Sequence, residues 1–361
     1  MSPRAQSRGL NMKTKFNINC LIRDNIKNIQ LYSSARDEFT EANAELVFLD
    51  ANENPFDNGV NRYPDPQQQK VKQLLSRIKG IATENILLGN GSDEVLDLLF
   101  RAFCEPKEDN IIILPPTYGM YSVLANINAI ETIEVQLTAQ FQPKTETILL
   151  AANENSKILF LCSPNNPTGN NFDNKSVEKL LKSFKGIVVL DEAYIDFSAQ
   201  KSWLSRSGEF PNLVITQTLS KAYGMAGIRL GVCYASKEII QVLKSIKPPY
   251  NVNELTQLKA IERLNKQNEV KMEIQQIIKQ KGFLINELNS IDFVQKIYPS
   301  DANFLLIKVD NAAERYKQLI AEGIVIRNRT KEPLCENCLR ISIGTAAENQ
   351  QLIKVLKLIN K

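Results

Sequence analysis

The sequence contains no histidine among its 361 residues. This absence excludes the Ser-His-Asp triad, the Cys-His nucleophile pair and every metal site that needs an imidazole ligand. Acid–base chemistry near neutral pH must therefore come from a lysine, aspartate, glutamate, tyrosine or cysteine whose pKa is shifted by its surroundings, or from a bound cofactor.

Long apolar runs and strong charge are missing as well. No run approaches the roughly 20 apolar residues that a membrane-spanning helix needs. The net charge of +4 is dispersed, so the sequence has no basic stripe for nucleic acid. Residues 1–11 are basic and lack the apolar core of a secretory signal, and we expect a disordered extension there. The composition predicts a cytoplasmic protein that binds neither nucleic acid nor membranes.

Cysteine is sparse and scattered. The six cysteines are Cys20, Cys104, Cys162, Cys233, Cys335 and Cys338. Most lie in apolar contexts, which is typical of buried thiols in a reducing compartment. The C-x-x-C pair at 335–338 has no second pair and no histidine to complete a zinc site, so we expect no metal.

Short apolar runs alternate with helical patterns over the first two thirds of the chain. We expect strands at 45–49, 110–114, 132–136, 157–161, 187–190, 213–216 and 231–235, and helices at 92–104 and 174–184. Several of these runs are continuously apolar, as expected of strands covered on both faces. The alternation predicts an α/β fold with a mostly parallel central sheet flanked by helices.

The pattern changes at the Pro-Pro pair 248–249. We expect helices at 236–246, 254–289, 311–322 and 346–359, and strands at 293–299, 303–309, 324–327 and 339–343. We interpret the chain as an N-terminal arm (12–44), a large domain (45–247) and a smaller α+β C-terminal domain (248–361).

Polar segments follow the apolar runs at the points where strands are expected to end. "CSPNNPTG" (162–169), "DEAY" (191–194) and "QTLSK" (217–221) each come directly after such a run, and "NGSDE" (90–94) opens a helix. Because ligands bind outside the carboxyl ends of parallel strands, we expect the four segments to converge at one edge of the sheet.

Each segment offers one chemical function beside a simpler structural explanation. Desolvation of Lys221 would lower the pKa of its amine and favour the neutral form that reacts with an aldehyde, although a solvated loop lysine is the alternative. Arg229 and the amides of Ser92 and Asp93 suit a phosphate, although a glycine-rich turn and a helix cap would use the same residues.

Two further residues suit a nitrogen heterocycle. Asp191 would keep a ring nitrogen protonated, and the alternative is a helix cap. Asn166 would donate to a phenolic oxygen, and the alternative is an Asn-Pro turn. A reactive lysine, a carboxylate, an asparagine and a phosphate site together match pyridoxal 5′-phosphate.

The segments "SPNNPTG", "DEAYIDF" and "TLSKAYGMAGIRLG" resemble the fold-type I pyridoxal-phosphate aminotransferases. More narrowly, "LDANENP" (49–55), "RYPDP" (62–66), "PPTYGMYS" (115–122) and "LRISIGT" (339–345) resemble the histidinol-phosphate aminotransferases, and the similarity runs from about residue 12 to the C-terminus. The resemblance implies a homodimer with shared active sites. It also implies transamination of L-histidinol phosphate with 2-oxoglutarate, giving imidazole-acetol phosphate and L-glutamate in histidine biosynthesis.

The resemblance also implies a role for each matching residue of the cofactor site. Lys221 would form the Schiff base with the cofactor and move the proton between the substrate α-carbon and cofactor C4′. Asp191 would pair with the pyridinium nitrogen, and Asn166 and Tyr194 would hydrogen-bond the phenolic oxygen. Tyr118 would stack on the ring. Gly91, Ser92, Asp93, Ser220 and Arg229 would hold the phosphate, and Tyr63 would reach it from the other subunit.

For the substrates, the resemblance implies a set of anion-binding residues. Arg340 matches the carboxylate-binding arginine of the family. Arg327 and Tyr32 match positions that hold the phosphate end of the substrate, and Asn52 lines the same pocket. Bidentate arginines suit both kinds of anion.

Three other functions remain open from the sequence. A threonine-phosphate decarboxylase and an aromatic amino-acid aminotransferase share the scaffold and motifs. The decarboxylase orients a carboxylate for loss, whereas transaminases orient the α-proton for removal. A regulator with an aminotransferase-like module would need an added DNA-binding domain, and residues 1–44 carry no helix-turn-helix pattern.

Overall fold

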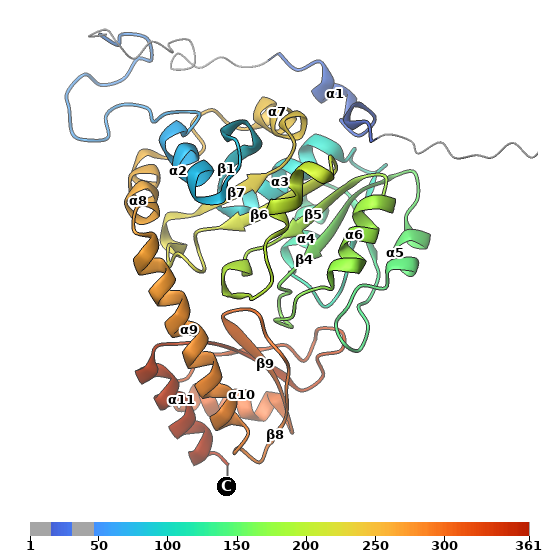
Figure 1. Ribbon diagram of the computed structural model, residues 1–361, viewed down its shortest axis with the longest axis vertical. Coiled ribbons are helices and arrows are strands. Elements are labelled where there is room, and N and C mark those ends of the chain that lie inside the picture. The colour runs from blue at the N-terminus through green and yellow to red at the C-terminus, as the bar shows by residue number, and fades with distance from the viewer. Residues whose placement is uncertain (1–15, 31–46, 361) are drawn as a thin grey trace, which may run out of the picture.

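The computed structural model describes residues 16–30 and 47–360 (Figure 1). Two sheets organise these residues. A seven-stranded sheet has the order β1-β7-β6-β5-β4-β2-β3, and a four-stranded sheet has the order β10-β11-β9-β8. Figure 1 shows the second sheet below the first, with the long helix α9 alongside. No helix of the described residues is long and apolar enough to cross a membrane.

The large sheet is mostly parallel. Its strands are β1 (Ile86–Asn90), β2 (Asn110–Ile113), β3 (Glu131–Glu134), β4 (Ser156–Cys162), β5 (Ile187–Asp191), β6 (Leu213–Thr218) and β7 (Leu230–Tyr234). Five neighbouring strands are parallel to one another, in the order β3, β2, β4, β5 and β6. β7 runs antiparallel to both of its neighbours, β6 and β1. Six of the seven strands predicted for this part of the chain are confirmed.

Helices cover both faces of this sheet, as predicted. They are α2 (Gln69–Lys79), α3 (Gly91–Phe103), α4 (Met120–Ile127), α5 (Thr145–Ala151), α6 (Asn174–Ser183) and α7 (Lys237–Ile246). The short α1 (Asp24–Lys27) contacts α7 and has no buried residue. Val188 and Leu190 of β5 belong to one core cluster, and Ile187 and Val189 belong to the cluster on the opposite face. This alternation explains the continuously apolar run, because both faces of the strand are buried.

The prediction of a strand at 45–49 is wrong for residues 47–49, which are the part of this range that the structure describes. Residues 47–49 have no regular secondary structure, and the side chains of Val47 and Leu49 are exposed. A short apolar run does not distinguish a buried strand from an exposed contact surface. The structure instead has β1, an edge strand of the sheet that the sequence analysis did not predict.

The second sheet packs under three helices. Its strands are β8 (Val294–Ile297), β9 (Phe304–Val309), β10 (Arg327–Asn328) and β11 (Cys338–Ser342). α9 (Gln267–Leu288), α10 (Ala312–Ala321) and α11 (Ala346–Leu358) contribute to its core. All four strands were predicted, but β10 is shorter than expected, because residues 324–326 are not paired.

The single helix expected over 254–289 is two helices. α8 (Glu254–Leu264) is capped by Asn265, and α9 begins at Gln267. α8 packs against α2 beside the large sheet, whereas α9 contacts α11 and β8 of the second sheet. The chain therefore passes from one sheet to the other at this break. The division into domains at residue 247 stays a prediction.

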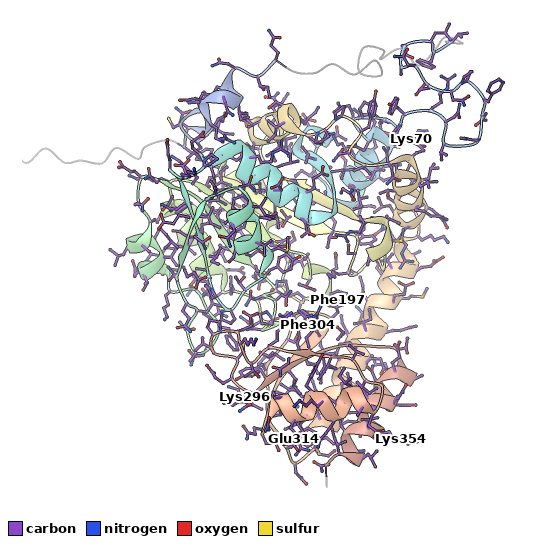
Figure 2. The ribbon with its side chains drawn as sticks, turned by 180° about the vertical axis from the view of Figure 1, so that it is seen from behind. Lys70, Phe197, Lys296, Phe304, Glu314 and Lys354 are labelled. Atoms are coloured by element: carbon purple, nitrogen blue, oxygen red, sulfur yellow. The ribbon has the colours of Figure 1, made fainter. Side chains whose placement is uncertain are left out.

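Aromatic and backbone contacts join the two parts. Figure 2 shows Phe197 and Phe304 at the junction, and both belong to one core cluster. The Phe304 ring meets the Tyr194 ring edge-on at 5.1 Å. The Asp301 amide donates to the Gly169 carbonyl at 2.7 Å. These contacts place the start of β9 against the loop that follows β4.

Gly231 of β7 lies against the first turn of α3. A Cβ atom at Gly231 would lie 2.3 Å from the Gly91 carbonyl carbon and from the Ser92 nitrogen. We expect Gly231→Ala to lower the free energy of unfolding by about 1–3 kcal/mol, because backbone atoms must move to admit the methyl group. Urea denaturation measures this change.

Gly282→Ala is the matched control, because a Cβ atom at Gly282 of α9 would meet nothing within 4 Å. Alanine there should raise the free energy of unfolding by about 0.5–1 kcal/mol. Equal effects of the two substitutions would contradict the close approach of β7 to α3.

Candidate active site

A cavity lies at the carboxyl ends of β4, β5 and β6, beside the first turn of α3. It is lined by Ser92, Asp93, Tyr118, Cys162, Asn166, Asp191, Ala193, Tyr194, Thr218, Ser220, Lys221, Ala226 and Arg229. The four polar segments therefore converge as the sequence predicted. Of the residues expected to bind the cofactor, only Gly91 and Tyr63 do not line this cavity.

Lys221 lies in the loop between the antiparallel strands β6 and β7. The Leu219 amide donates to the Leu230 carbonyl at 3.0 Å and closes the base of this loop. The Lys221 side chain stays exposed because the cavity is open, with its Nζ 5.7 Å from the centre of the Tyr194 ring. Partial desolvation and then the charges of two arginines, Arg340 and Arg229, lower the pKa of Lys221.

Asp191 ends β5 and is buried. The Tyr121 hydroxyl donates to its Oδ2 at 2.8 Å, and the Ala193 amide donates to its Oδ1 at 3.2 Å. Burial raises the pKa of Asp191, and these hydrogen bonds oppose the rise. The sequence analysis missed Tyr121, which comes one helical turn after Tyr118 in the same motif.

Asn166 connects the two sheets. Its Nδ2 donates to the Tyr194 hydroxyl at 3.5 Å, and its Oδ1 accepts a hydrogen bond from Arg340 Nη1 at 2.5 Å. Burial raises the pKa of Tyr194. The Asn166 amide and the Tyr194 phenol are therefore two neutral donors beside Lys221.

The first turn of α3 and Arg229 form a cradle for an anion. Gly91 has φ +78°, and a Cβ atom there would lie 2.7 Å from Arg229 Nη2. The N-cap residue Asn90 makes no side-chain capping hydrogen bond, so it does not use the first-turn amides of α3. Arg229 lies 3.5 Å from the Asp93 carboxylate, which also accepts a hydrogen bond from the Tyr118 hydroxyl. A helix N-terminus with an arginine beside it suits a phosphate.

A second cavity of about 360 Å³ adjoins the first and shares Lys221 with it. It is lined by Thr117, Tyr118, Gly119, Met120, Asn166, Pro167, Tyr194, Lys221, Arg327, Arg329 and Arg340. Arg327 of β10 pairs directly with Arg340 of β11. The predicted substrate-binding arginines are thus brought together, and Arg329, which was not predicted, lies with them.

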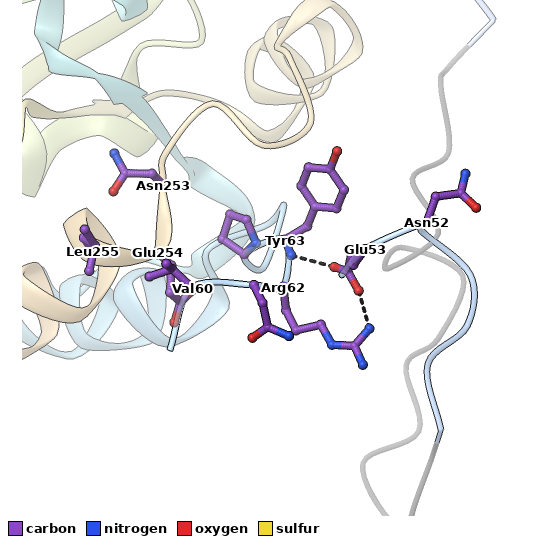
Figure 3. Close-up of a pocket in the computed structure, with 10 residues that line it drawn as sticks. Asn52, Glu53, Val60, Arg62, Tyr63, Asn253, Glu254 and Leu255 are labelled. Carbon is purple, nitrogen blue, oxygen red and sulfur yellow. Dashed lines mark hydrogen bonds and ion pairs between the residues drawn. The ribbon is translucent and has the colours of Figure 1, made fainter. Parts of the chain in front are cut away.

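Other predicted residues lie elsewhere. Asn52 and Tyr63 line a separate cavity beside α8 (Figure 3). The Tyr63 ring stacks on Tyr250 with centroids 4.5 Å apart, and its amide donates to Glu53. A single chain therefore does not bring Asn52 or Tyr63 to Lys221. Tyr32 lies outside the described residues.

Comparison with known sequences identifies close relatives of the chain. A profile of the family "Aminotransferase class I and II" matches residues 36–356. The histidinol-phosphate aminotransferase of Flavobacterium johnsoniae is 65% identical over 346 residues, which cover 96% of this chain and 99% of the relative. That of Parabacteroides distasonis is 52% identical and covers 93% of this chain and 97% of the relative.

Solved structures confirm the predicted fold class. The histidinol-phosphate aminotransferase from Clostridium acetobutylicum has a TM-score of 0.77 at 25% identity and covers 83% of this chain and 91% of that chain. The L-threonine-O-3-phosphate decarboxylase from Porphyromonas gingivalis has a TM-score of 0.71 at 25% identity, with the same coverage. The fold is therefore shared by enzymes of two reactions and does not separate them.

The raised pKa of Asp191 predicts a pH dependence of stability. The folded protein holds this proton more strongly than the unfolded chain does, so stability falls as pH rises above the ordinary carboxyl pKa. Asp191→Asn removes the buried charge and keeps the shape of the side chain. We expect the ligand-free variant to have a higher urea midpoint than wild type at about pH 8, and no advantage at about pH 4.

Chemical denaturation at the two pH values provides the measurement. A variant that is less stable than wild type at the higher pH would show that Tyr121 and Ala193 fully compensate the buried carboxylate.

Proposed function

Because this chain belongs to the class I and II aminotransferases, and within them to the histidinol-phosphate aminotransferases, we propose that it transfers the amino group of L-histidinol phosphate to 2-oxoglutarate. The products are imidazole-acetol phosphate and L-glutamate, and the reaction is a step of histidine biosynthesis. The 65% identity to the Flavobacterium enzyme over nearly the whole of both chains carries the proposal. The decarboxylase from Porphyromonas gingivalis and the Clostridium acetobutylicum enzyme are both 25% identical to this chain, so the discrimination between the two reactions rests on the 65% identical relative.

We infer that pyridoxal 5′-phosphate is the cofactor, because the first cavity fits its two ends. The cradle of α3 and Arg229 suits the phosphate. The hydrogen bonds that Asp191 receives from Tyr121 and Ala193 come from neutral groups, so a protonated ring nitrogen would supply the opposite charge. When bound, this group acts as an electron sink for the carbanion left by loss of the α-proton.

The residues of the chain bind, orient and move the proton. The lowered pKa of Lys221 increases the fraction of neutral amine at Nζ. This amine would hold the cofactor by condensing with its aldehyde with loss of water, and once the amino group of the substrate has displaced it, the free amine would accept the α-proton. Asn166 and Tyr194 both line the first cavity, and the second N–H of the Asn166 amide and the Tyr194 hydroxyl would orient a phenolic oxygen there. Arg340 and Arg327 hold the substrate anions beside Lys221.

We also infer a homodimer with shared sites. Segment 47–64 has no regular secondary structure, and Figure 1 shows it extending from the body of the molecule. It exposes the side chains of Val47, Leu49, Phe56, Val60 and Tyr63. Leu255 and Leu258 of α8 are exposed as well. Exposed apolar patches of this kind mark interaction surfaces, and a second copy would bring Tyr63 to the phosphate cradle of its partner.

Titration of the purified yellow protein with L-histidinol phosphate tests the function. We expect the visible absorbance to bleach and to recover when 2-oxoglutarate is added, because the amino group is transferred in two halves. Lys221→Ala should lower turnover by about 10³-fold or more, because it removes both the nucleophile and the base.

The alternatives predict other outcomes. A yellow protein that ignores L-histidinol phosphate and releases carbon dioxide from threonine phosphate would be a decarboxylase. One that responds only to phenylalanine or tyrosine would be an aromatic aminotransferase. Substantial turnover by the Lys221→Ala variant would overturn the assignment of Lys221.

Tyr63→Phe tests the shared site. Loss of one charge-assisted hydrogen bond to the phosphate should weaken cofactor retention by about 10- to 100-fold, as measured by dialysis and absorbance. Mixing this variant with Lys221→Ala should restore retention and turnover in hybrid dimers, because one of the two sites then has both native residues. Absence of restoration in verified hybrids would show that Tyr63 serves its own subunit or no site.

A further inference from the structure

Arg327 and Arg340 face the second cavity from the paired strands β10 and β11, and Arg329 faces it from the segment that follows β10. Arg327 and Arg340 are directly opposite each other in the β10–β11 pair. The Arg329 amide donates to the Cys338 carbonyl at 2.8 Å, which continues this ladder beyond β10. Because alternate residues of an extended chain point to the same side, Arg327 and Arg329 present their side chains to one cavity, and both line it.

The charges of this cavity are all of one sign. Its lining contains Lys221 and the three arginines and no carboxylate residue. Like charges opposite each other on a sheet destabilise it. Burial, followed by the charges of Arg329 and Arg327, lowers the pKa of Arg340. An anionic ligand with more than one negative charge would offset this repulsion.

Two of the arginines also have unused donors. Arg329 Nε and Arg340 Nε are buried atoms with no hydrogen-bond partner among residues 16–30 and 47–360. A buried donor without an acceptor is destabilising. Arg329 Nη1 lies 3.5 Å from Glu332, and this ion pair is the one that the described part of the chain provides for its guanidinium.

A transaminase of the proposed function must accept two substrates whose negative charge is distributed differently. The phosphate of L-histidinol phosphate carries nearly two negative charges on one group at neutral pH. Glutamate and 2-oxoglutarate carry the same two charges on two separate carboxylates. A pair of arginines matches two separate carboxylates, and a third arginine beside one of them matches the concentrated charge of the phosphate.

We propose that Arg329 is a specificity-determining residue that binds the phosphate dianion of the substrate and returns to Glu332 when the dicarboxylate is bound. This inference rests on the proposed function. Arg327 and Arg340 hold the anions of both substrates, whereas Arg329 contacts only the phosphate.

Arg329→Gln tests the inference, with Lys331→Gln as the matched control. Lys331 is exposed, lies two residues away and does not line the cavity, so its loss changes the net charge equally. We expect Arg329→Gln to raise KM for L-histidinol phosphate by about 10- to 100-fold and KM for 2-oxoglutarate by less than about threefold. Lys331→Gln should change neither value.

Inhibition by inorganic phosphate provides a second test. Its pH dependence would not change if Arg329 had a purely structural role. In the wild-type holoenzyme, competition of phosphate with glutamate should strengthen from about pH 6 to about pH 8 as the dianion forms. In Arg329→Gln this strengthening should be mostly lost. Glu332→Gln releases Arg329 and should bind phosphate at least as well as wild type.

Several results would overturn the inference. They are an equal rise in KM for both substrates, no change for either, or a Glu332→Gln variant that loses affinity as Arg329→Gln does. The last would show that Arg329 acts by holding its loop. If the wild-type enzyme does not turn over L-histidinol phosphate, the proposed function fails, and phosphate inhibition alone then decides the role of Arg329.

Discussion

A buried carboxylate without a fixed cation determines the arrangement of the site. Asp191 is held by backbone register, because it pairs across β5 with Cys162 of β4 and with Thr216 of β6. Its position therefore depends on three parallel strands rather than on a loop. Burial disfavours the charge, and Tyr121 only partly relieves it. The large sheet thus keeps a negative group where a cationic ring atom would bind most strongly.

The second sheet controls the direction of a donor on the first. The side-chain amide of Asn166 has an acceptor oxygen and a donor nitrogen, and the oxygen accepts a hydrogen bond from Arg340. The amide nitrogen must then face Tyr194. Because Arg340 is 174 residues away and belongs to β11, the arginine proposed to bind the substrate and the asparagine proposed to face the cofactor are oriented together. Displacement of either sheet would affect both proposed functions at once.

The sequence was sufficient for features that depend on local pattern. Continuously apolar strands and the polar segments that follow them placed the large sheet and most residues of the first cavity correctly. Features that depend on contacts between distant segments were not predictable. Nothing local separates the run at 45–49, of which Val47 and Leu49 are exposed, from a strand. Nothing local shows that the polar pattern breaks at 265–266 either. The contact of Tyr121 with Asp191 and the place of Arg329 at the second cavity depend on neighbours from other strands and helices.

The break between α8 and α9 has a geometric consequence. α9 has 22 residues, so it is about 33 Å long and spans from the large sheet to the far side of the second one. A rotation of about 5° at Asn265 would carry its far end about 3 Å, roughly the length of a hydrogen bond. Because α9 contacts β8 and α11, such a rotation would move the second sheet, with Arg327 and Arg340, relative to Lys221. The angle between α8 and α9 would therefore set the spacing between the arginines and the lysine.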